Sequence, residues 1–264
     1  MATNATAGLT SQWAKRRSVV TRSSGPTIRR VTGEGKPVLL VHGFASSRLQ
    51  NWGTTGWIDR LAQEGYRVVS FDCRGHGLSD KPHDAESYGR HMAEDILTVM
   101  HAAGLPAANV MGYSMGGMLT IDLVMRHTER VLKAVVAGLG ANYFDEQQDW
   151  RENVATALLT DDPSLIADNE ARKFRIFGGQ KGKDRLALAA CMRSPRSKYT
   201  PDDLKASQRP VLVVAGESDT LVGSPFGLAK AFADGRAVIL PNKDHMTAVG
   251  DPGYKRAVLD FLAA

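Results

Sequence analysis

Short apolar runs along this chain alternate with segments whose apolar residues recur at helical spacing. The run Pro37–Val41 is uninterrupted, which suits a strand buried on both faces of a parallel sheet. Met92, Ile96, Val99 and Met100 then fall on one helical stripe. Further strands are predicted at 18–22, 27–32, 66–71, 108–111, 131–137, 210–215 and 237–240. This order predicts an α/β fold: a mostly parallel, doubly wound sheet of about eight strands with helices on both faces.

The pattern changes between residues 143 and 205, where no segment makes a convincing strand. Trp150, Val154, Ala157 and Leu158 instead predict an amphipathic helix. An insertion after a strand, at the ligand-binding end of the sheet, is typical of a lid, although a helical appendage that only packs on the core is the alternative. We expect residues 18–142 and 206–264 to form one core, 143–205 a small helical cap, and 1–17 a flexible basic leader.

Composition limits the compartment and the partners. The net charge of +5 arises in residues 1–36, which hold seven basic residues and one acidic residue. These charges predict a solvated tail, because a nucleic-acid site would interleave basic residues with aromatic ones. The chain has no apolar run of about 18 residues for membrane insertion and opens with no signal-peptide core. Cys73 and Cys191 are too few for a disulfide framework and lack metal-ligand spacing, so we expect a reduced, cytoplasmic protein.

The segment Gly112-Tyr113-Ser114-Met115-Gly116 has the G-x-S-x-G pattern of a nucleophile elbow. An apolar strand-type run precedes it, and 118–125 contains no Pro or Gly, as a buried helix requires. In such a turn the serine backbone is strained, and only residues without a Cβ fit at the flanking positions. A Gly-Ser loop without chemistry is the alternative interpretation.

Together with the elbow, four other motifs in this order resemble the α/β-hydrolase family, over residues 18–264. They are His42-Gly43-Phe44, DCRGHGLS (72–79), GESD (216–219) and Asp244-His245. The resemblance implies a triad in the order serine, acid, histidine, which Ser114, Asp219 and His245 fit. Glu217 and Asp145 are the competing acids. One departure is Asp244, where the family often has glycine; a carboxylate there could raise the pKa of the histidine or bond elsewhere.

These residue types suit acyl transfer. A serine hydroxyl is a poor nucleophile, so His245 would accept its proton and Asp219 would orient the imidazole. His42 and His76 lie in turns of the family motifs, where we expect structural roles. The family pattern implies an oxyanion hole from the backbone N–H groups of Met115 and Phe44.

The substrate pocket is less specified by the sequence. Candidate lining residues are Phe44, Tyr113, Phe144 and Trp150. The mechanism requires no metal or organic cofactor, and no phosphate-cradling loop is present. The acyl and alcohol parts of the substrate and the oligomeric state stay open.

The expected reaction is cleavage of a small to medium carboxylic ester or lactone. Relatives that use an aspartate nucleophile, the epoxide hydrolases and haloalkane dehalogenases, are excluded by Ser114. Three alternatives remain. One is a carbon–carbon bond hydrolase of vinylogous diketones, which usually carries a glycine-rich oxyanion loop where this chain has Phe44-Ala45-Ser46-Ser47. The others are a cofactor-free perhydrolase or haloperoxidase type, and a non-catalytic ligand-binding module.

Overall fold

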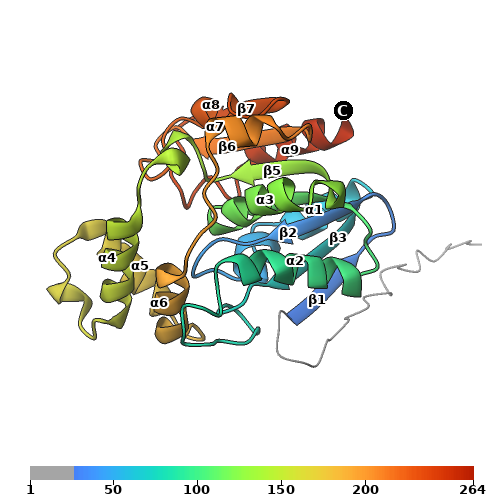
Figure 1. The fold of residues 1–264 in the computed structure, drawn as a ribbon. Helices are drawn as coiled ribbons and strands as arrows, with labels where there is room; N and C mark the ends of the chain where they lie inside the picture. Colours follow the sequence, from blue (N-terminus) through green and yellow to red (C-terminus); the bar gives the residue numbers. More distant parts are fainter. Residues whose placement is uncertain (1–26) are drawn as a thin grey trace, which may run out of the picture.

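A twisted, mostly parallel sheet forms the centre of the computed structural model, which describes residues 27–264, with side chains from residue 32 (Figure 1). Its strand order is β1-β3-β2-β4-β5-β6-β7, with β1 antiparallel to β3 and the other neighbours parallel. The strands are β1 Thr27–Thr32, β2 Pro37–Val41, β3 Arg67–Asp72, β4 Ala108–Tyr113, β5 Val131–Ala137, β6 Val211–Gly216 and β7 Gly235–Leu240. The α/β fold is therefore confirmed. The predicted leader and the strand at 18–22 lie outside the described residues.

Helices cover both faces of the sheet. The side chains of Leu39, Val110 and Val136 pack with α2 (Arg90–Ala102), α3 (Met115–Arg126) and α8 (Pro225–Ala229). On the opposite face, Leu40 and Met111 pack with α1 (Trp57–Gln63) and α9 (Pro252–Ala263). Because consecutive side chains of a strand point to opposite faces, a continuous apolar run such as β2 serves both cores. None of the helices in the described part of the chain is both long and apolar enough to cross a membrane.

The register of the central strands brings their carboxyl ends to one edge. Val41 pairs with Gly112, Tyr113 with Ala137, and Gly216 with Leu240. The loops that follow β2, β4, β6 and β7 therefore open at the same edge, although they are far apart in sequence. These loops hold the residues that the motifs predict to be functional.

A group of helices lies beside this edge (Figure 1, yellow to orange). It comprises α4 Gln148–Leu159, α5 Asn169–Gly178 and α6 Arg185–Arg193, and α4 packs on the other two. The chain then returns to β6 through α7 Pro201–Lys205. The predicted helix around Trp150 corresponds to α4. The sequence Asp161 to Ser164 also predicts the start of a second helix, but the structure has only a short turn at 163–165, and the next helix, α5, begins at Asn169. Asp168 caps α5 by accepting the Ala171 N–H at 2.8 Å.

Short helical turns complete the chain. They are η1 Leu49–Gly53, η2 Thr128–Arg130, η3 Ala141–Phe144 and η4 Pro163–Leu165. Two of them, η1 and η3, follow β2 and β5 at the open edge, so they contribute to the walls of the site described next.

Candidate active site

Ser114 lies at a sharp turn between β4 and α3. Its backbone has φ 53° and ψ −115°, a conformation that costs energy for any residue with a side chain. Hydrogen bonds hold it there: the Ser114 N–H donates to the Ala137 carbonyl at 2.7 Å, and the Met118 N–H donates to the Ser114 carbonyl at 3.1 Å. The strand–turn–helix context that the G-x-S-x-G pattern requires is present.

The two glycines of the elbow are required by close backbone approach. A Cβ on Gly112 would lie 2.0 Å from the Gly116 carbonyl oxygen, and one on Gly116 would lie 2.1 Å from the Val41 carbonyl oxygen. Both contacts are with backbone atoms that cannot move aside. The steric reason expected from the pattern is therefore observed.

His245 and Asp219 come from two different loops and contact each other through their side chains. The His245 Nδ1 lies 2.7 Å from Asp219 Oδ2, and the Asp219 side chain is fully buried. Since a carboxylate only accepts, the Nδ1–H of a neutral imidazole donates here, which leaves Nε2 with its lone pair. Asp219 Oδ1 also accepts the Leu221 N–H at 3.2 Å, which fixes the orientation of the carboxylate.

The competing acids are engaged elsewhere or exposed. Glu217 accepts the Asn242 N–H at 3.0 Å, and Asp145 is solvent-exposed. Asp244, at the position where glycine is common, accepts the N–H groups of Met246 and Thr247. These hydrogen bonds lower the pKa of Asp244. Its carboxylate therefore stabilises the turn at 244–247 and is not available to His245. Among the described residues, Asp219 alone pairs with His245.

Ser114 and His245 line the same cavity. Ser114, Asp219 and His245 all line a cavity of about 730 Å³. Within residues 27–264 no hydrogen bond joins the Ser114 hydroxyl to the His245 ring. Such catalytic contacts are often long without substrate and shorten when it binds.

Two backbone N–H groups beside Ser114 have no acceptor in the described structure, those of Phe44 and Met115. Met115 opens α3, where the first N–H groups of a helix lack partners. The Gly43 turn lies against the elbow, because a Cβ on Gly43 would be 3.5 Å from Ser114 Cβ. Both donors therefore belong to the two turns that meet at Ser114, where the family pattern leads us to expect an oxyanion hole.

Buried polar side chains hold the turn that carries Phe44. Asn51 accepts the Gly43 N–H at 2.9 Å, and His42 accepts the Cys73 N–H on Nε2 while its Nδ1–H donates to the Gly43 carbonyl. His76 packs edge-on against His42 and Phe44, and burial lowers its pKa to about 3. Both imidazoles are thus neutral scaffolding. Asn51 was missed by sequence reasoning, since its loop has no motif of its own.

The four candidate pocket residues do not share one role. Phe44 and Trp150 line a second cavity of about 620 Å³, which also reaches Ser114. Tyr113 lines the first cavity, and its hydroxyl donates to the His245 carbonyl at 2.6 Å. The prediction that Phe144 lines the substrate pocket is wrong. Its side chain is exposed, packs edge-on against Tyr143 and lines neither cavity. The short η3 turn points it outward.

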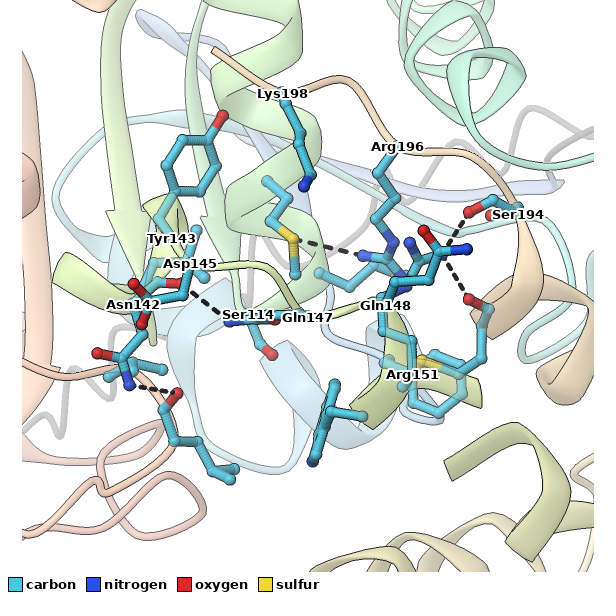
Figure 2. A pocket seen from close by; sticks show the side chains of 18 of the residues that line it. Ser114, Asn142, Tyr143, Asp145, Gln147, Gln148, Arg151, Ser194, Arg196 and Lys198 are labelled. Carbon is cyan, nitrogen blue, oxygen red and sulfur yellow. Dashed lines mark hydrogen bonds between the residues drawn. The ribbon is translucent and has the colours of Figure 1, made fainter. Parts of the chain in front are cut away.

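The second cavity contains polar residues that the sequence did not single out. Figure 2 shows the side chains of Arg196 and Lys198, from the segment 194–198, pointing into this cavity. Arg151 and Gln148 line it from α4. Their approach depends on the packing of α4 and the 194–198 segment, which no local pattern reveals.

Comparison with known proteins agrees with this geometry. A family model described as "alpha/beta hydrolase fold" matches residues 36–175, more than half of the chain. The chain belongs to the α/β-hydrolase family. An AB hydrolase superfamily protein of Bacillus subtilis is 33% identical over 222 residues, covering 77% of this chain and 81% of that protein.

Two further relatives of this α/β hydrolase are similar along almost the whole chain. A 2-hydroxymuconate semialdehyde hydrolase of Pseudomonas putida is 26% identical over 251 residues, covering 88% of each chain. The crystal structure of a hydrolase from Pseudomonas aeruginosa superposes with a TM-score of 0.76 at 25% identity, covering 96% of this chain and all of that one. Hydrolase activity is thus supported by fold and by relatives.

Proposed function

We propose that the chain is a serine hydrolase that cleaves a small to medium carboxylic ester or lactone through an acyl-enzyme on Ser114. The observation that carries the proposal is the 2.7 Å contact between Asp219 and His245, at the sheet edge where the strained Ser114 is presented. The pairing orients the imidazole so that Nε2 can accept a proton.

In the first half-reaction, the Ser114 hydroxyl attacks the substrate carbonyl while His245 Nε2 takes its proton. The buried Asp219 carboxylate stabilises the imidazolium that forms. The negative charge that develops on the carbonyl oxygen is stabilised by the N–H groups of Phe44 and Met115. His245 then returns the proton to the leaving alcohol, and the acyl group stays on the serine.

In the second half-reaction, water repeats these steps on the acyl-enzyme. His245 activates the water, the same donors hold the oxyanion, and Ser114 leaves as the alcohol. For a lactone the leaving hydroxyl stays joined to the acyl group, and a single hydroxy acid is released. No step requires a metal or an organic cofactor.

Two cavities that meet at Ser114 suit a substrate with two parts. Their volumes, about 730 and 620 Å³, match compact organic molecules. Phe44 and Phe174 line both, and Trp150 closes the smaller one from α4. We therefore assign residues 143–205 the role of a cap that forms the roof over the serine.

A carbon–carbon bond hydrolase is the second candidate, favoured by the similarity to the 2-hydroxymuconate semialdehyde hydrolase. It would use the same triad on a vinylogous diketone. The segment Phe44-Ala45-Ser46-Ser47 lacks the glycine-rich loop usual in such enzymes, which favours ester cleavage. A panel of esters, lactones and diketones, compared by kcat/KM, separates the two.

Covalent labelling tests the proposed nucleophile. A fluorophosphonate probe should add to Ser114, with the site identified by peptide mass. Ser114→Ala should abolish labelling and His245→Ala should slow it severely, while circular dichroism shows both variants folded. Labelling of Ser114 at the wild-type rate in His245→Ala would show that His245 is not the base.

A further inference from the structure

The smaller cavity carries charged side chains that the proposed chemistry does not use. It lies between the elbow, α4 and the segment 192–198, and it reaches Ser114 at one end. Four cationic side chains and three carboxylates line it. The question is which of these charges are already paired within the protein.

Two of the four cations have a carboxylate partner. Arg193 pairs with Glu152 at 2.6 Å, and Lys198 pairs with Glu146 at 2.5 Å. Glu146 lies outside the cavity lining, and the remaining lining acids, Asp145 and Asp149, are solvent-exposed. These pairs and exposed groups have no need of a ligand.

Arg151 and Arg196 differ from these two cations in their partners. Neither has a carboxylate within 4.0 Å among the described residues. Arg151 donates through Nη2 to the carbonyl oxygens of Met192 and Ser194, but its Nε is buried and has no acceptor in the part of the chain that the structure describes. Burial lowers its pKa to about 10, and the nearby Arg196 adds to this effect. An arginine guanidinium keeps its proton at neutral pH, so both side chains carry a positive charge.

Arg196 has a weak partner. Its Nη1 contacts the Met118 sulfur at 3.4 Å, and a thioether is a poor acceptor that carries no charge. Burial lowers the pKa of its guanidinium. Figure 2 shows this guanidinium at the centre of the cavity, with its contact to the sulfur drawn. A half-buried cation left without an anion is costly unless a ligand supplies the charge.

We propose that Arg196, supported by Arg151, binds a carboxylate of the substrate, so that the natural ester or lactone is a monoanion with its charged end in the smaller cavity. This assignment rests on the proposed function at Ser114 and names its substrate class. A planar guanidinium matches a carboxylate in shape and charge. A single substrate carboxylate would supply the anionic partner that Arg196 lacks among residues 27–264.

Matched esters test the assignment. One series consists of mono-para-nitrophenyl esters of dicarboxylic acids from succinate to suberate; the other has the same chains ending in a carboxamide. The carboxylate form of the best chain length should exceed its carboxamide in kcat/KM by about 10- to 100-fold, because a charged hydrogen bond is lost in the amide. Arg196→Met should reduce this ratio to near one, mainly through KM, and Arg196→Lys should restore part of it.

The double variant Arg193→Met, Glu152→Gln is the matched control. Both residues line the same cavity and neutralise each other, so removing both leaves its net charge unchanged and the ratio should stay at the wild-type value. Thermal unfolding of each variant shows whether the fold survives. Equal turnover of both esters by the wild type, or an unchanged ratio in Arg196→Met, would overturn the assignment.

If the proposed serine-hydrolase function itself is wrong, the same experiments give a different result. In that case Ser114 is not labelled by the fluorophosphonate probe and neither ester series is cleaved. If labelling and cleavage are normal but carboxylates have no advantage, only the anion site is refuted.

Discussion

Replacing Asp219 by asparagine isolates the contribution of one buried carboxylate to the proposed mechanism. Asparagine has the same shape, and its amide oxygen can keep the bond to the Leu221 N–H, now 3.2 Å long. The NH₂ group then faces His245 Nδ1, where the carboxylate oxygen now lies 2.7 Å away. An NH₂ group donates, so Nδ1 must accept and the proton moves to Nε2. The imidazole can then no longer accept the proton of Ser114.

The expected loss follows from these two effects, the wrong tautomer and the missing counter-charge. A substitution of this kind lowers kcat by about 10³- to 10⁴-fold, which corresponds to about 4 to 5.5 kcal/mol in activation free energy. KM should change little, because Asp219 does not touch the substrate. Turnover of a para-nitrophenyl ester, followed from the released nitrophenolate, measures both constants.

Glu217→Gln provides the matched control for this prediction. Glu217 lies two residues away in the same loop, and its carboxylate accepts the Asn242 N–H instead of contacting the imidazole. Its kcat should stay within about twofold of the wild type. If Asp219→Asn kept more than a tenth of the activity, or if Glu217→Gln lost as much, Asp219 would not be the acid of the triad.

Three further predictions concern the scaffold around the site. Tyr113→Phe removes the 2.6 Å bond to the His245 carbonyl and should lower the free energy of unfolding by about 1 to 2 kcal/mol, with reduced kcat; unchanged values in urea unfolding and turnover would refute this. Gly116→Ala places a Cβ 2.1 Å from a carbonyl oxygen of β2 and should cost about 3 kcal/mol or more, whereas Gly250→Ala, whose nearest atom is 3.7 Å away, should cost under about 1 kcal/mol. Burial lowers the pKa of His76 from 6.5 to about 3, so the unfolded chain binds its proton between these values and the folded chain does not. Stability should therefore fall by about 1.4 kcal/mol per unit as pH drops below 6.5, and His76→Gln should show a shallower slope in urea unfolding.

Much of the fold is encoded in local patterns. The continuous apolar runs at 37–41 and 131–137 became β2 and β5 with the same bounds, because a strand buried on both faces leaves a signal within its own residues. The glycines around Ser114 likewise mark a turn that only residues without a Cβ permit. The helix α5 has a weaker signal: its apolar residues Phe174 and Phe177 lie beside two glycines, and its stability comes from packing on α4.

The sequence alone determined the fold class, the nucleophile turn and the set of residues from which a triad could be drawn, since each is written in a contiguous pattern. Only the tertiary structure decided that Asp219 rather than Glu217 pairs with His245, because two residues of a loop point in different directions once the loop is closed. It also turned Phe144 outward and left Arg196 without a carboxylate partner among residues 27–264. Pairing and direction depend on distances between segments remote in sequence, and those distances exist only in the folded chain.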